Sequence, residues 1–248
     1  MASQTLPSTE MPERGNSFAR ILGVWFSPKA TFQSIVRRPT WLAPALLLAV
    51  LSLSAVALFG HRGGWPSYFE RQMASNSRVQ QMNAQERQRA MQIQLKIGVP
   101  ATYVVTPVVP LVLVLLLAAI FLGIFNGLAG AKLGFKTSMG IVAYAYSPGI
   151  ISGLLAILVI SLKDPTTIDL QNIVASSAGA FLPSSSPRWM VALFGSLDLF
   201  SFWYMILMAI GYSAAAPKKL SFGTAFAWIF AAWLIYVLMK VGLTAAFS

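Results

Sequence analysis

The chain has 248 residues, of which 56% are hydrophobic and only 10% are charged. Soluble domains carry about 25% charged residues, so this composition excludes an ordinary soluble globular protein and favours a polytopic membrane protein. The sequence contains no cysteine, which excludes disulfides, thiolate metal sites and cysteine nucleophiles within it. The net charge of +11 comes largely from Lys and Arg that flank apolar segments, where they bind anionic headgroups, so no nucleic-acid partner is expected.

The N-terminal 40 residues precede any apolar span. Residues 1–16 form a polar tail that we expect to be disordered. No signal peptide is apparent, so the first span is expected to serve as its own targeting signal. Apolar residues then recur at helical spacing in 18–25, and a Ser-Pro pair at 27–28 begins a second short helix. These basic amphipathic helices either lie in the headgroup plane or pack on the protein's own helices.

Five apolar segments follow, each close to or above the roughly 20 residues that cross a bilayer core. The predicted spans are 41–59, 101–126, 138–161, 189–213 and 221–246. With the short helices they predict an all-α polytopic membrane domain over 17–248. Five spans place the C-terminus on the side of the membrane opposite the N-terminus. The Lys and Arg counts on the two sides are nine and eight, which favours a cytoplasmic N-terminus by one residue.

The longest predicted loop, 60–98, is rich in Gln and Arg. Part of it has helical character, but Met91, Ile93, Leu95 and Ile97 alternate and do not form one helical stripe. Three interpretations stay open for this loop: a solvated helix, an interfacial helix or a docking surface. No internal repeat is apparent in the chain, which counts against the inverted-repeat transporter folds.

The sequence offers few residues with which to build an enzyme. His61 is the only histidine, so one chain cannot form a multi-histidine metal site. Of seven carboxylates only Asp198 lies within a predicted span, whereas an intramembrane aspartyl protease needs two. No nucleophile-elbow motif accompanies the histidine. We therefore predict a non-enzymatic protein with no catalytic residue, no metal and no cofactor.

Two pairs of glycines have the small-xxx-small spacing that lets membrane helices approach closely. Gly123 and Gly127 lie in the second span, and Gly149 and Gly153 lie in the third. Each pair is interpreted either as a packing site within the bundle or as a surface for self-association. Pro148 precedes the second pair and predicts a kink, because proline lacks a backbone N–H and crowds the preceding turn.

The predicted spans also contain a candidate polar site. Tyr144 and Tyr146 lie beside the expected kink, where they either satisfy freed backbone groups or line a polar cavity. An ionised carboxylate in the bilayer costs about 2.5 kcal/mol or more and usually has a partner. In an antiparallel hairpin of the last two spans, Lys240 comes within reach of Asp198 and Tyr236 lies level with it. A structural pair with either residue, a proton or ion relay, and a headgroup contact are the alternatives for Asp198.

Three segments, FSPKATFQSIVRRPTWLAPALLL, AYAYSPGIISGLLAIL and LDLFSFWYMILMAIGYS, resemble a known family. They are similar, in the same order, to the Yip domain of the Ypt-interacting-protein family, in its prokaryotic branch, over about 18–246. The matching positions are Pro28, Phe32, Tyr144, Pro148, Phe200, Trp203 and Gly211.

The resemblance implies a five-helix integral membrane protein with a cytoplasmic N-terminus. Eukaryotic members are associated with Rab-type small GTPases, but this chain has a short tail and lacks their Asp-Leu-Tyr-Gly-Pro pattern, which does not favour GTPase binding. Our leading hypothesis is a protein of the cell membrane that organises membrane or partner proteins. Its partners would be anionic lipid headgroups and a membrane protein or a second copy of the chain. The alternative is a small transporter, channel or lipid scramblase that uses Asp198.

Overall fold

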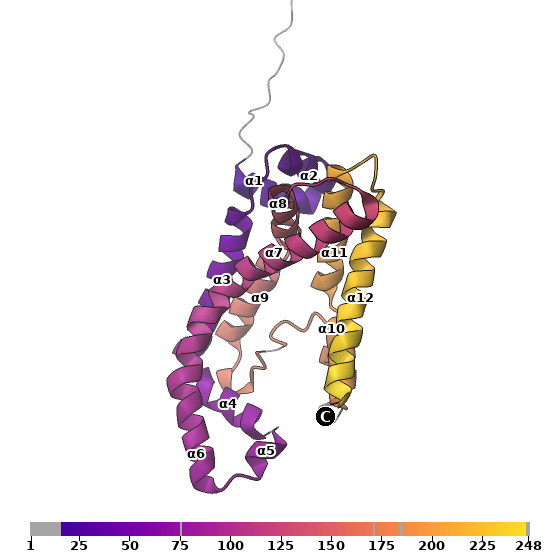
Figure 1. Cartoon of the computed structure of the whole chain (residues 1–248). Helices are drawn as coiled ribbons and strands as arrows, with labels where there is room; N and C mark the ends of the chain where they lie inside the picture. The colour runs from indigo at the N-terminus through magenta and orange to yellow at the C-terminus, as the bar shows by residue number, and fades with distance from the viewer. Residues whose placement is uncertain (1–15, 75, 171, 184–185, 247–248) are drawn as a thin grey trace, which may run out of the picture.

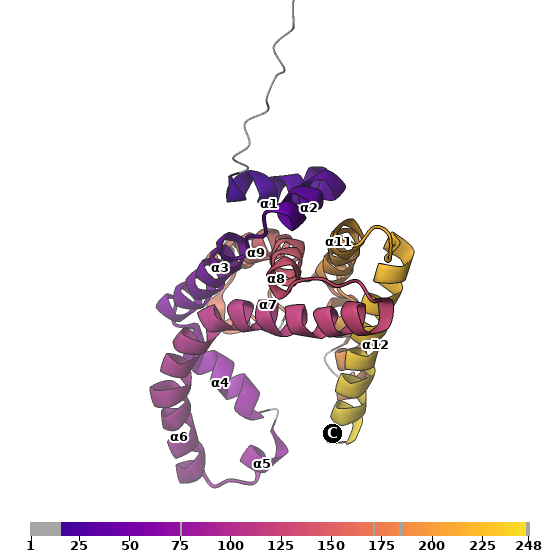
Figure 2. The same cartoon turned by 45° about the horizontal axis from the view of Figure 1, so that its top comes forward.

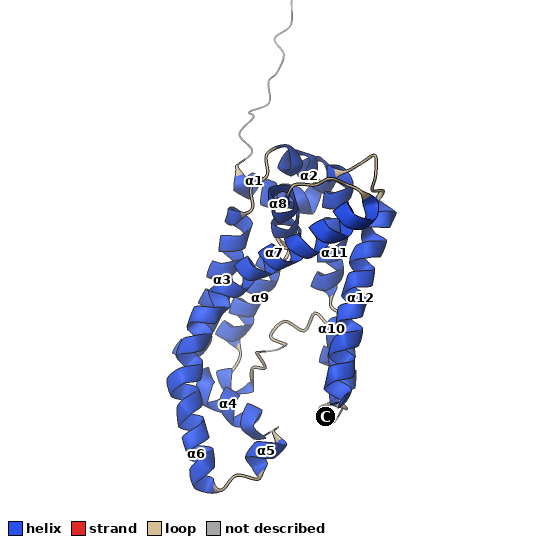
Figure 3. Ribbon diagram, in the orientation of Figure 1, coloured by secondary structure: helices blue, strands red, loops and turns tan. Residues whose placement is uncertain are grey.

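The computed structural model describes residues 16–74, 76–170, 172–183 and 186–246. Within these residues the regular structure is helical and no strand is present, as the sequence predicts (Figure 3). The predicted disordered tail lies outside the described residues except for Asn16. The Asn16 side chain accepts a hydrogen bond from the Phe18 N–H and caps the first helix.

The elements are α1 (Ser17–Phe26), α2 (Pro28–Arg37), α3 (Leu42–His61), α4 (Gly64–Ala74), α5 (Ser77–Gln80), α6 (Ala84–Ile93), the π-helical segment η1 (Gln94–Gly98), α7 (Val99–Ala129), α8 (Phe135–Ala145), α9 (Gly149–Leu162), the 3₁₀ segments η2 (Pro165–Thr167) and η3 (Ala178–Phe181), α10 (Arg188–Ser196), α11 (Leu199–Ala215) and α12 (Phe222–Ala246).

Four helical segments in the described part of the chain are long and apolar enough to cross a membrane. They are Leu42–His61, Ala84–Ala129, Phe135–Leu162 and Phe222–Ala246, and they correspond to the first, second, third and fifth predicted spans. The fourth predicted span, 189–213, is divided between α10 and α11, which both pack on α12 (Figure 1). The protein is therefore a polytopic all-helical membrane protein in which this segment is not one continuous helix.

The predicted loop 60–98 is largely helical. Its first helix, α4, packs Trp65 and Phe69 beneath α3, where the Trp65 ring lies 5.2 Å from that of Phe59 and 5.8 Å from that of Phe69. By contrast, α6 has no buried residue and continues through η1 into α7. Of the two longer helices in this loop, α4 thus packs on the bundle and α6 is exposed.

Two arginines fasten this end of the molecule to the connection after α9. Arg62 donates a hydrogen bond to the Lys163 carbonyl at 2.8 Å, at the C-terminus of α9. Arg71, in α4, donates to the Ile168 carbonyl at 2.7 Å. A cation at a helix C-terminus is favourable because the last carbonyls have no partner within the helix.

The helices α1 and α2 form a layer across the opposite end of the bundle (Figure 2). Ile21 and Val24 of α1 and Phe32 and Ile35 of α2 are buried and belong to the main hydrophobic core. On this face the two helices therefore pack on the protein's own helices, which was one of the two interpretations from the sequence.

Arg20 fastens α1 to the end of α2. Its side chain is buried and donates to the Arg38 carbonyl at 3.0 Å, to Ser34 Oγ at 3.2 Å and to Thr40 Oγ1 at 3.2 Å. These acceptors lie around the C-terminus of α2, where the helix dipole favours a positive charge. The N-terminal layer is thus held by polar contacts as well as by apolar packing.

Candidate functional site

Asp198 lies between α10 and α11 and caps the second of these helices. Its Oδ1 accepts a hydrogen bond from the Ser201 N–H at 3.0 Å, and its Oδ2 accepts one from the Ser176 hydroxyl. A side-chain oxygen at this position satisfies a backbone donor that has no partner within the helix, and a carboxylate is favoured at a helix N-terminus. The carboxylate therefore has a local structural role.

The connection between α9 and α10 forms backbone hydrogen bonds with the residues between α10 and α11. The Ala178 N–H donates to the Leu197 carbonyl at 3.0 Å, and the Leu199 N–H donates to the Ser176 carbonyl at 3.1 Å. These bonds surround an isolated antiparallel bridge between Ser177 and Asp198. Non-helical backbone at membrane depth is tolerated only where it is buried in protein or lines a cavity. The connection supplies the partners that the interrupted helix lacks.

The predicted pair between Asp198 and Lys240 does not form. Lys240 Nζ instead donates to Ser196 Oγ at 3.3 Å, on the last residue of α10. Tyr236 is 57% exposed and makes no hydrogen bond to Asp198. One straight helix through residue 198 would bring Asp198 within reach of Lys240, but the interruption turns the carboxylate toward the α9–α10 connection. Lys240 therefore lies beside the interruption but holds α10 without contacting Asp198.

The two tyrosines of the third span have different environments. Tyr144 is fully buried, and its hydroxyl lies 3.1 Å from Thr40 Oγ1. Tyr146 follows the end of α8, where the chain makes a turn through Pro148 before α9 begins. The kink predicted at Pro148 is thus present as an interruption between two helices. Ser147 Oγ in this turn accepts a hydrogen bond from Trp25 Nε1 at 2.9 Å.

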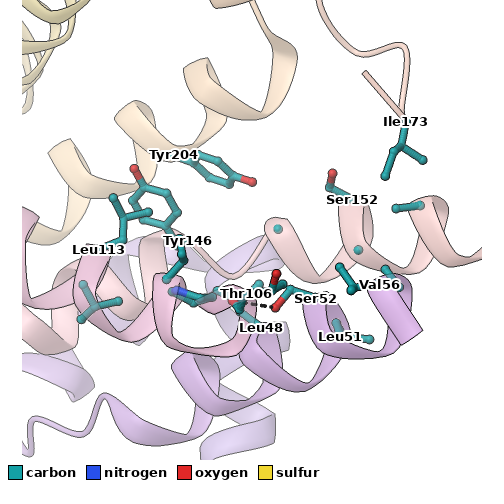
Figure 4. Close-up of a pocket in the computed structure, with 17 residues that line it drawn as sticks. Leu48, Leu51, Ser52, Val56, Thr106, Leu113, Tyr146, Ser152, Ile173 and Tyr204 are labelled. Carbon is teal, nitrogen blue, oxygen red and sulfur yellow. Dashed lines mark hydrogen bonds between the residues drawn. The ribbon is translucent and has the colours of Figure 1, made fainter. Parts of the chain in front are cut away.

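A cavity of about 390 Å³ opens between α3, α7, α9 and α11 (Figure 4). Such a volume is within the ~300–1,000 Å³ range of small-molecule sites. Tyr146 and Tyr204 form one wall, with their rings stacked at a centroid distance of 4.5 Å. The other residues that line it are Leu48, Leu51, Ser52, Ala55, Val56, Thr106, Val109, Pro110, Leu113, Val114, Gly149, Ser152, Gly153, Ala156 and Ile173.

Proline and glycine shape the walls of this cavity. Pro110 lacks an N–H and so leaves the Thr106 carbonyl without its normal helical donor; Ser52 Oγ reaches that carbonyl at 3.5 Å. On α9, a Cβ added at Gly149 would lie 3.0 Å from Leu48, and one at Gly153 would lie 3.3 Å from Leu51. These two glycines therefore let α9 pack closely on α3.

The other glycine pair, Gly123 and Gly127, has no such neighbour. A Cβ added at either position would meet no atom within 4 Å, and both residues are exposed on α7. The same sequence spacing thus corresponds to close packing on α9 and to an open surface on α7.

Several residues that carry the family resemblance lie where helices begin or pack on one another. A Cβ at Gly211 would lie 2.5 Å from Ile141 and 3.0 Å from Phe32, so α2, α8 and α11 meet there. Phe200 stacks on Trp203 along α11 at a ring distance of 6.4 Å. Pro28 begins α2. These residues determine how the N-terminal layer and α11 pack.

A comparison with family models gives a match to the Yip1 domain over residues 22–244. The chain belongs to the Yip1 domain family. The match covers nearly the whole chain and confirms the resemblance seen in the sequence. No curated protein and no solved structure matches the chain.

The chemistry of the cavity of this Yip1 domain is neutral. Among the described residues, no charged side chain lines it. Within the described residues no three His, Cys, Asp or Glu side chains gather as a metal site. Tyr204, Ser52 and Thr106 were not singled out in the sequence, although Pro107 and Pro110 beside Thr106 signal an irregular helix. Ser176, which contacts Asp198, gave no sequence signal because its partner is 22 residues away.

Proposed function

We propose that this Yip1-domain protein is a non-enzymatic organiser of the membrane that gathers anionic lipid at the end covered by α1 and α2. The observation that carries the proposal is an exposed apolar row on α1, made by Phe18, Leu22 and Phe26. The opposite face of the same helix is packed on the bundle. An amphipathic helix with such a face lies in the headgroup region and inserts its apolar side chains among the lipid tails.

The charge of this end supports the proposal. Its described segments, 16–41, 130–136 and 214–222, hold eight Lys and Arg, four, two and two respectively, and no Asp or Glu. Lys29, Arg37 and Lys219 are exposed there. Each basic residue near an anionic membrane surface contributes about 1 kcal/mol of attraction. An N-terminus in the cytoplasm, where anionic lipids are concentrated, is part of this proposal.

A groove of about 470 Å³ at the same end offers a place for a headgroup. Lys29 and Gln33 of α2 form its polar side, and Ser213 lies at the end of α11. Leu220 and Phe222 give it an apolar wall. A basic rim above an apolar wall matches a lipid with an anionic headgroup and two acyl chains.

Retention of lipid through purification tests the proposal. Native mass spectrometry would count the phosphatidylglycerol and phosphatidylcholine molecules that stay bound to the wild type and to the triple variant Lys29→Gln/Arg37→Gln/Lys219→Gln. We expect the variant to lose most of its preference for phosphatidylglycerol. The matched control, Arg87→Gln/Arg89→Gln/Lys96→Gln, removes three exposed charges at the other end and should keep the preference. Equal losses in both variants would refute the proposal.

The proposed partner of this protein is a membrane protein or a second copy of the chain. Gly123 and Gly127 present an open small-residue surface on α7, and such surfaces support close helix association in lipid. Cross-linking of the protein in liposomes, with Gly123→Leu as the variant, tests whether this surface is used. Loss of a cross-linked species in the variant would support it, and an unchanged pattern would oppose it.

A small transporter, channel or scramblase is the second candidate function. One observation favours this function: the helix is interrupted at Asp198, and Tyr204 of the following helix lines a cavity. Interrupted helices form substrate sites in transporters. Proton flux and fluorescent-lipid scrambling would be measured in liposomes with the wild type and Asp198→Asn. Activity that disappears in a stably folded Asp198→Asn variant would favour this function. No activity in either protein would exclude it.

A further inference from the structure

Three hydroxyl groups on the walls of the cavity have no hydrogen-bond partner in the part of the chain that the structure describes. They belong to Tyr146, Tyr204 and Ser152, all of which line the space between α3, α7, α9 and α11 (Figure 4). A hydroxyl without a protein partner can donate a hydrogen bond to a ligand, so these groups favour a ligand that offers oxygen acceptors.

The surroundings restrict the ligand to a lipid. Three of the four helices around the cavity, α3, α7 and α9, belong to segments of membrane-spanning length, and its walls are otherwise apolar except for Ser52 and Thr106. No charged side chain lines it within the part of the chain that the structure describes. A phosphate would find no cation among these lining residues. A neutral oxygen attached to a hydrocarbon chain meets both requirements.

We infer that this cavity binds one acyl chain of a glycerolipid, with the ester carbonyl oxygen accepting a hydrogen bond from Tyr204, whose hydroxyl points toward the Ser152 side of the cavity whereas that of Tyr146 points away from it (Figure 4). The acyl chain lies in the cavity between α3, α7, α9 and α11, and the Ser152 hydroxyl faces it from α9. This site is separate from the basic end of the molecule, and it stands whether or not that end gathers anionic lipid.

A photoreactive lipid tests the site in liposomes. The probe is phosphatidylcholine with a diazirine in the middle of one ester-linked acyl chain, and its comparison is the ether-linked analogue of equal chain length. In the wild type we expect labelling on the cavity walls of α7 and α9, with the ester probe preferred. Tyr204→Phe should lose this preference, with about tenfold weaker ester labelling, equivalent to about 1.4 kcal/mol.

Two phenylalanine variants on α9 separate filling of the cavity from a general change of the helix. Ser152→Phe fills the space and should abolish labelling by both probes. Leu158→Phe, at an exposed position on the same helix, should be labelled like the wild type. Thermal unfolding in micelles confirms that each variant is folded. Undiminished cavity labelling in Ser152→Phe, or equal labelling by ester and ether probes in the wild type, would overturn the inference.

Discussion

Two apolar helical segments are interrupted in the described part of the chain, one between α8 and α9 at Tyr146–Pro148 and one between α10 and α11 at Leu197–Asp198. The first is stabilised by local turns, and Ser147 is fully buried and bonded to Trp25. The second depends on bonds to a distant segment and on one carboxylate. At the proline interruption the backbone bonds are local and one side chain bonds to a distant helix, whereas at the interruption without proline part of the backbone itself finds its partners elsewhere in the chain.

The largest effect is expected where the distant segment touches α10. In Gly179→Ala the new Cβ would lie 2.9 Å from the backbone N and Cα of Gly195, which cannot rotate aside. We expect a loss of about 3 kcal/mol in the free energy of unfolding, measured by SDS titration in mixed micelles. Gly195→Ala is the control, because its Cβ would meet nothing within 4 Å. Equal losses in the two variants would contradict this packing.

Loss of the cap at the second interruption should have the next largest effect. Asp198→Ala removes the acceptor for the Ser201 N–H and the Ser176 hydroxyl, which should cost about 2 kcal/mol of unfolding free energy. Asp198→Asn keeps a capping oxygen and should cost clearly less. The same SDS titration compares them. If Asn is as damaging as Ala, the charge itself is essential and the capping account fails.

The first interruption should be less sensitive. Ser147→Ala leaves the Trp25 indole N–H without its acceptor and should cost about 1 kcal/mol of unfolding free energy. A double-mutant cycle with Trp25→Phe measures the pair directly, and the second substitution should then add little through this bond. Independent, additive losses would mean that this hydrogen bond does not stabilise the turn.

The smallest effect is expected at the start of the α9–α10 connection. Thr166 donates from its N–H and its hydroxyl to Asp164 Oδ1, and these bonds lower the pKa of the Asp164 carboxyl. The stabilisation of the folded protein by the ionised Asp164 carboxylate is therefore present above the pKa that this group has in the unfolded chain. It is lost as the pH falls through the lower pKa of the group in the folded protein. Thermal unfolding between pH 7 and pH 3 should show a slightly smaller acid destabilisation in Asp164→Asn. An identical pH dependence in both proteins would contradict the assignment.

The sequence predicts what depends on local chemistry. Pro148 predicts the interruption between α8 and α9, because proline cannot continue the hydrogen bonds of a helix. The sequence shows Asp198 as a polar residue in an apolar run. It does not show its partner Ser176, which lies in another segment, and the register of a helical hairpin pointed to Lys240 instead. Likewise, neither the close packing of Gly149 nor the exposure of Gly123 follows from their common spacing, because both depend on which helices come together.

The proposal that one end of the protein gathers anionic lipid can be tested directly, because the chain has no cysteine. Single cysteines at exposed Ala19 on α1 and at exposed Gln88 on α6 would carry a fluorescent donor at opposite ends. Energy transfer to labelled phosphatidylglycerol and phosphatidylcholine in liposomes reports which lipid surrounds each end. We predict enrichment of phosphatidylglycerol around Ala19→Cys and little around Gln88→Cys. Equal enrichment at both ends, or none at either, would contradict the account.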